Sequence, residues 1–183
     1  MSEPPPERPY AIPELTRALR AFASHRGAPG SDHDRYFAPL VDALRSARDA
    51  VAADGVAPWR AAARVDAEAI ANAVRATCAA LAEERSAGAA PARRALEAEL
   101  VELAEPLFAA LADVGTAARA LAAAPEAARP AAWNAWTAAF GRAFAAADAC
   151  WEASLPALAD PRGGVGRLWR SLLRQRGVRG AGP

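Results

Sequence analysis

Residues 133–158, WNAWTAAFGRAFAAADACWEASLPAL, decide how this chain folds. At about 100° per residue, one helical stripe collects the large apolar side chains of this stretch together with one alanine. Its members are Trp133, Trp136, Phe140, Phe144, Ala147, Trp151, Leu155 and Leu158. Arg142 falls on the opposite side. Each aromatic ring can bury about 150–250 Å², so the pattern predicts the central helix of a bundle.

The rest of the chain is rich in alanine and poor in large side chains. About 55 of the 183 residues are alanine, whereas Leu, Ile, Val and Phe together supply roughly one residue in six. So low an apolar fraction indicates disorder only when the net charge is also high, and here it is +1. Because the apolar residues are strongly periodic, we expect thin helices packed closely through alanine faces.

Neither the cysteines nor the first residues indicate a secreted or membrane protein. Cys78 and Cys150 are too far apart in sequence for a zinc or CxxC site, so we expect buried free thiols. Residues 1–9 are acidic and proline-rich without the apolar run of a signal peptide. The longest uncharged run, Pro130–Gly141, is shorter than the ~18 residues of a spanning helix. A cytoplasmic location is the resulting expectation.

The first half of the chain predicts three helices after a disordered leader. The first begins near Pro13 and ends at Gly27. The second begins after Ser31, which forms a capping box with Asp34, and ends at residues 54–55. Pro39 either kinks this helix or marks the start of its main part. Its inward residues are Phe37, Leu40, Val41, Leu44 and Val51.

A third helix is predicted from Pro58 to Arg85, with one acid, Asp66, on its apolar stripe. The fourth begins at Pro91 and continues to residue 121 with a nearly heptad apolar rhythm. Pro106 should bend it. The apolar stripe of the fourth helix comprises Leu96, Leu100, Leu103, Leu107, Leu111, Val114, Ala118 and Leu121. The aromatic helix follows, and Pro156 and Asp160-Pro161 are expected to end it.

These elements predict an all-α protein: a mainly antiparallel, up-and-down helical bundle of about five long helices plus a short C-terminal amphipathic helix. Residues 1–10 form the leader and residues 11–160 the bundle. Residues 161–183 comprise a Gly/Arg-rich joint, a short basic helix over 166–176 and a disordered end.

The sequence contains no pattern that favours catalysis or a bound metal or cofactor. The only histidines, His25 and His33, do not complete the Glu-x-x-His pairs of di-metal bundles. Residues 32–34, Asp-His-Asp, could bind a metal, but two acids at a helix start are better interpreted as complementing its positive end. The dense glutamates of residues 97–105 indicate a solvated face. Asp66 either pairs with an arginine or is a buried carboxylate with a raised pKa. We predict no catalytic residue, no cofactor and no metal.

The basic end of the chain is the sharpest candidate site. Residues 162–183 hold six arginines and no acid, whereas the preceding 161 residues hold 16 arginines and 21 acids. Leaving a tryptophan and three leucines in water is costly, at about 1.5–3 kcal/mol per large side chain, so this segment needs a partner. The candidate partner-binding residues are Arg167, Leu168, Trp169, Arg170, Leu172, Leu173, Arg174 and Arg176.

Several partners fit such a segment. The chain's own bundle could accept it, as could a groove on another protein or a second copy. An anionic membrane or granule surface is an alternative, and nucleic acid is disfavoured because one short arginine helix is thin evidence. We therefore expect a non-enzymatic helical interaction or adaptor protein. A third hypothesis is a small-molecule binder or enzyme with an aromatic-lined cavity and Asp66 as its polar group.

Overall fold

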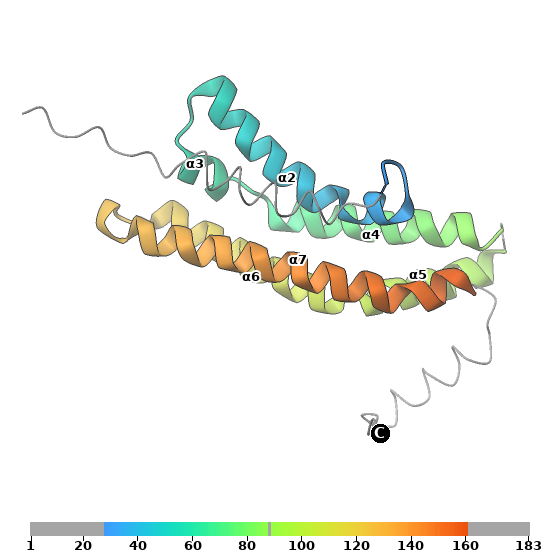
Figure 1. Cartoon of the computed structure of the whole chain (residues 1–183). Helices are drawn as coiled ribbons and strands as arrows, with labels where there is room; N and C mark the ends of the chain where they lie inside the picture. The colour runs from blue at the N-terminus through green and yellow to red at the C-terminus, as the bar shows by residue number, and fades with distance from the viewer. Residues whose placement is uncertain (1–27, 88, 161–183) are drawn as a thin grey trace, which may run out of the picture.

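The computed structural model describes residues 28–87 and 89–160, which form a bundle of helices (Figure 1). Over these residues there are six α-helices, one short 3-10 helix and no strand. The predicted all-α class is therefore confirmed. The elements are α2 (Asp32–Asp54), α3 (Pro58–Ala63), α4 (Ala67–Arg85), α5 (Ala90–Leu103), α6 (Glu105–Ala123), η1 (Glu126–Ala128) and α7 (Arg129–Ala159).

The helices run mainly antiparallel to one another, as predicted, although the consecutive helices α5 and α6 share one direction. In Figure 1, α5 and α6 run in the same direction, and α7 returns antiparallel to both. The helix α4 runs in the direction of α7, while α2 runs opposite to α4 and diverges from it toward α3. The most extensive contact between two of the described helices is that of α6 with α7.

The start and end of α2 follow the predicted capping residues. The Ser31 hydroxyl accepts the backbone N–H of Asp34 at 3.1 Å, and the Asp34 carboxylate accepts that of Gly30 at 3.0 Å. At the other end Gly55 adopts φ +62°, which a residue without a Cβ tolerates. The helix passes through Pro39, so it does not begin there. All five residues expected to face inward are buried.

The expected single helix from Pro58 to Arg85 is wrong, because the chain forms two helices, α3 and α4. The break lies between residues 63 and 67, where Asp66 has an extended backbone. Its carboxylate accepts the backbone N–H groups of Glu68 and Ala69, both at 3.0 Å. These two N–H groups would otherwise lack partners at the start of α4, so the acid stabilises a new helix start.

The predicted fourth helix also consists of two elements, with the change at the predicted place. Ala104 separates α5 from α6, and Pro106 lies in the first turn of α6. Proline fits a first turn, where its missing N–H costs no hydrogen bond. The sequence therefore located the irregularity correctly but predicted a bend where the helix is interrupted. Pro106 lies in the first turn of a new helix and not within a continuous one.

The aromatic helix is confirmed as α7, with one correction. The helix continues past Pro156 and ends at Ala159 with Asp160 as its cap, so the second of the two expected ends is the observed one. Leu155 was expected to be buried but is 40% exposed, and Ser154 is buried instead. The Ser154 hydroxyl donates a hydrogen bond to the backbone carbonyl of Cys150 at 2.8 Å, so its burial leaves no unpaired donor. The buried face of α7 therefore includes small side chains, which a pattern of large apolar residues does not reveal.

The core is filled by aromatic rings from α7 and α2 together with leucines from the other helices. Consecutive rings of α7 contact one another, with centroid distances of 5.5 Å for Trp133–Trp136, 5.2 Å for Trp136–Phe140 and 5.9 Å for Phe140–Phe144. Phe37 of α2 continues this row by stacking on Phe144 at 6.5 Å. The predicted role of these rings as the bulk of the core is confirmed.

Candidate functional site

The partner-binding residues expected from the sequence all lie outside the described residues. They are Arg167, Leu168, Trp169, Arg170, Leu172, Leu173, Arg174 and Arg176. The helix expected over residues 13–27 and the leader lie outside them too. The structure places the point where this basic segment begins, because α7 ends at Ala159 and Asp160 caps it.

Asp66 and the aromatic row, the two features of the small-molecule hypothesis, do not share a cavity. Asp66 is exposed at the start of α4, where it caps the helix. The rings of Trp136, Phe140 and Phe144 are each at most 2% exposed and pack on one another. The arrangement that this hypothesis needs is therefore not formed by the described residues.

Both cysteines are buried free thiols, as predicted. Burial raises the pKa of the Cys78 thiol to about 11, and the nearby Cys150 thiol contributes to the shift. Burial likewise raises the pKa of Cys150 and, together with the two thiols, that of the Tyr36 hydroxyl. Groups that stay protonated at neutral pH are poor nucleophiles, so this cluster is suited to filling the core.

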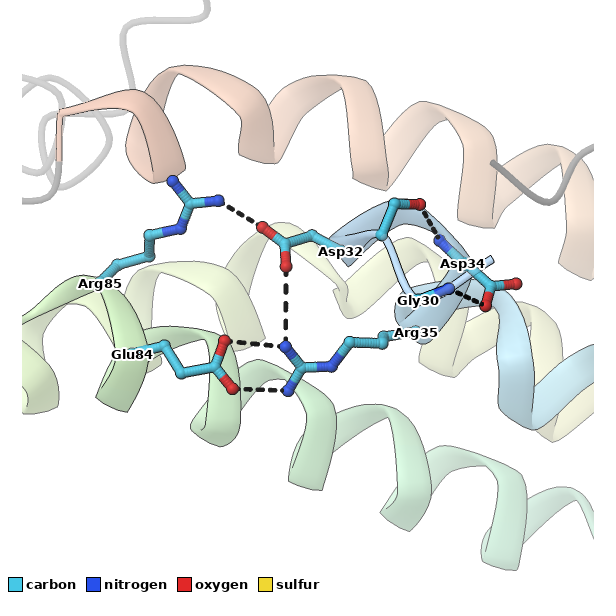
Figure 2. A network of polar contacts seen from close by, with 7 residues as sticks. Gly30, Asp32, Asp34, Arg35, Glu84 and Arg85 are labelled. Atoms are coloured by element: carbon cyan, nitrogen blue, oxygen red, sulfur yellow. Dashed lines mark hydrogen bonds and ion pairs between the residues drawn. The ribbon is translucent and has the colours of Figure 1, made fainter. Parts of the chain in front are cut away.

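A network of ion pairs fastens the first turn of α2 to the last turn of α4 (Figure 2). The Arg35 guanidinium donates to both oxygens of Glu84, at 2.8 and 2.9 Å, and lies 3.6 Å from Asp32. Arg85 pairs with the other oxygen of Asp32. The hydrogen bonds from Arg35 lower the pKa of Glu84. These contacts join two distant segments at the surface, where ion pairs are salt-sensitive.

The acids at the start of α2 are engaged in this network rather than grouped around a metal position. Asp32 pairs with arginines and Asp34 with the Gly30 amide. The His33 ring packs on Phe37 and Trp151, at 4.6 and 5.3 Å between centroids. Over residues 28–87 and 89–160, no three His, Cys, Asp or Glu side chains are grouped in a way that could hold a metal ion.

The expected solvated face of glutamates on α5 and at the start of α6 needs one correction. Glu102 and Glu105 are exposed and Glu97 is half-buried, but Glu99 is only 9% exposed. Its position two residues from Glu97 on a helix directs it to a different side, toward the buried face that Leu96 and Leu100 occupy. Direction around the helix, and not the density of acids, decides which of these carboxylates reach water.

An open groove of about 400 Å³ lies where α2 diverges from α4. Alanines from three helices dominate its lining, with Ile70 and Val65 as the largest apolar side chains. Asp42, Arg64 and Asp66 also line it. The groove exists because methyl side chains cannot span the space between diverging helices.

A second hollow, of about 360 Å³, lies between α4 and α6. Two arginines line it, Arg75 from α4 and Arg119 from α6, with Phe108 and Thr116 beside them. Sequence reasoning did not single out these residues. The two arginines are far apart in the chain and follow no motif, so only the packing of α4 against α6 brings them together.

Comparison with known proteins does not identify the chain. No protein-family model matches it, and neither a curated protein nor a solved structure matches it.

Proposed function

We propose that this chain is a non-enzymatic helical interaction protein that docks to a partner through the basic amphipathic segment 167–176. The observation that carries the proposal is the separation of charge along the chain. Residues 28–160 hold 12 arginines and 18 acids, a charge of −6, whereas the residues after Asp160 hold six arginines and no acid. An end with six arginines and no acid favours recognition of a negatively charged surface.

The chemistry of the described bundle supports a role without catalysis. The shifted pKa values belong to surface ion pairs, such as Arg35–Glu84 and Arg93–Glu83, and to the buried cluster of Tyr36 and the two thiols. The first group fastens helices together and the second fills the core. Both are structural uses of ionisable side chains.

Affinity capture with the full chain and with a chain ending at Asp160 tests this proposal. Because the arginines and the apolar side chains act together, we expect the shortened chain to lose the partner. Replacing Arg167, Arg170 and Arg174 by Gln should give most of the same loss. A matched control replaces Arg45, Arg48 and Arg142 on the bundle, of which Arg45 and Arg142 are exposed and Arg48 is partly exposed. Equal recovery of the partner by the full and shortened chains would contradict the proposal.

An anionic membrane or granule surface is the second candidate for the partner. One observation bears on it: by length and composition alone, α6 is apolar enough to cross a membrane. The core helix of a soluble bundle satisfies the same criterion. Sedimentation with anionic and with neutral vesicles, at low and high salt, separates the two partners. Binding to anionic vesicles that becomes weaker at high salt would favour a membrane or granule surface as the partner. Absence of binding to anionic vesicles would exclude this candidate.

A further inference from the structure

We propose that the hollow between α4 and α6 binds a small carboxylate that carries an apolar body. This site does not involve the basic C-terminal segment, so it stands independently of the proposed function. Its floor is apolar and buried, and its rim presents arginine side chains. The floor consists of Ala67, Ala71, Phe108 and Leu111.

Arg75 is held in place at one side of the hollow. Its guanidinium lies over the Phe108 ring, 4.2 Å from the centroid, and Nη1 donates to the Asn72 side chain at 3.1 Å. A guanidinium has five N–H groups, so these contacts orient the side chain while leaving further donors for a ligand. Stacking on an aromatic ring is compatible with binding an anion at the edge of the guanidinium.

Arg119 is held in a similar way at the other helix. Its Nη2 donates to the Thr116 hydroxyl at 3.1 Å. Its Nη1 lies 3.5 Å from the position that a Cβ on Gly115 would occupy, and Ala67 of α4 lies 3.3 Å from that same position. The contact with Ala67 would be a tight one, so the glycine favours the close approach of α4 to α6, whereas the contact with Arg119 would be an ordinary one.

The charge of the hollow favours an anion. Arg35, Arg85 and Arg93 each pair with a carboxylate, but within the described part of the chain neither Arg75 nor Arg119 does so. Glu68 also lines the hollow and opposes an anion, so the two arginines exceed it by one charge. A carboxylate that accepts hydrogen bonds from a guanidinium makes a charge-assisted contact.

The size of the hollow limits the ligand. Its volume of about 360 Å³ is near the lower end of small-molecule sites in proteins, roughly 300–1,000 Å³. A medium-chain or aromatic monocarboxylate fits this volume, and a dinucleotide does not. The apolar body would lie on Leu111, Ala67 and Ala71, because the Arg75 guanidinium already covers the Phe108 ring, and the carboxylate would face the arginine side chains of the rim.

Calorimetry on the full chain with three related ligands tests the proposal. Octanoate has both parts of the expected ligand, acetate has only the charge, and octanol has only the apolar body. We expect octanoate to bind with one-to-one stoichiometry and at least about tenfold more tightly than either of the others. Equal affinities for octanoate and octanol would overturn the role of the arginines.

Three variants locate the binding at this hollow. Arg75→Gln and Arg119→Gln should each lower the affinity for octanoate about tenfold without changing the affinity for octanol. Ala112→Leu, at an exposed position of the lining, should narrow the hollow and weaken both ligands. Arg45→Gln removes an exposed arginine of α2 and should change the affinity for neither octanoate nor octanol. No binding of octanoate, or binding that all three lining variants leave unchanged, would overturn the site.

Discussion

Two sides of this bundle are built from side chains of very different size. On the aromatic side, α7 and the first half of α2 bring together Trp136, Phe140, Phe144 and Phe37, each at most 2% exposed. On the alanine side, the second half of α2 faces α3 and the start of α4 largely through methyl groups, and a groove of about 400 Å³ stays open. Large rings fill the space between helices, whereas alanines require helices to approach closely and leave a gap where they diverge.

The largest expected effect comes from removing the centre of the aromatic side. Trp136→Ala should destabilise the protein by about 3–5 kcal/mol, because a fully buried ring leaves a cavity that its neighbours fill only partly. Urea unfolding followed by circular dichroism measures this. Trp136→Phe should cost much less, since its indole N–H has no hydrogen-bond partner in the described structure.

The matched control for this prediction is Leu155→Ala on the same helix. Leu155 is 40% exposed, so its removal should change stability by less than about 0.5 kcal/mol. A similar loss for Trp136→Ala and Leu155→Ala would remove the distinction between the buried and the exposed face of α7.

A second prediction concerns how the free energy of unfolding depends on pH through the buried groups Cys78, Cys150 and Tyr36. The folded-state pKa of Cys78 is raised to about 11 from 9.0, so the folded protein keeps a proton that the unfolded chain loses as the pH rises above 9. The stability from this group is complete below pH 9 and is lost as the pH rises to 11, by about 2–3 kcal/mol. The raised pKa values of Cys150 and Tyr36 act in the same direction.

Urea unfolding at pH 7, 9 and 10.5 measures this loss. Cys78→Ala should be less stable at pH 7 but should show a shallower decline above pH 9. An unchanged slope in Cys78→Ala would show that the thiol is not protected from titration in the folded protein.

A smaller effect is expected on the alanine side, at the break between α3 and α4. Asp66→Ala removes the acceptor for two backbone N–H groups and should cost about 1 kcal/mol. Asp66→Asn, which keeps an acceptor at this position, should restore most of the loss. If Asp66→Ala proved neutral, the cap would not explain why the chain forms two helices here.

The sequence predicted well what large side chains determine. The alignment of Trp133, Trp136, Phe140 and Phe144 was enough to place α7, and Ser31 and Gly55 were enough to bound α2. It failed at the break between α3 and α4. Asp66 was interpreted as an acid on the apolar stripe of a continuous helix, because its role as a cap depends on a backbone turn that apolar periodicity does not reveal.

The two candidate sites, the basic C-terminal segment and the hollow between α4 and α6, also differ in how far the sequence reveals them. The basic segment was visible from charge alone, since its arginines are close together in sequence. Arg75 of α4 and Arg119 of α6 line the same hollow only because α4 packs against α6, next to Gly115. No local pattern of residue types encodes such an approach, so this hollow could be found only in three dimensions.

Native-state hydrogen exchange tests most directly the claim that the aromatic side holds the bundle together. We predict that the backbone amides of residues 136–151 in α7 exchange most slowly, with protection that matches the free energy of global unfolding. The amides of α3, six residues long and beside the open groove, should exchange through local opening at least about tenfold faster. Equal protection of α3 and α7, or faster exchange in α7, would contradict this account.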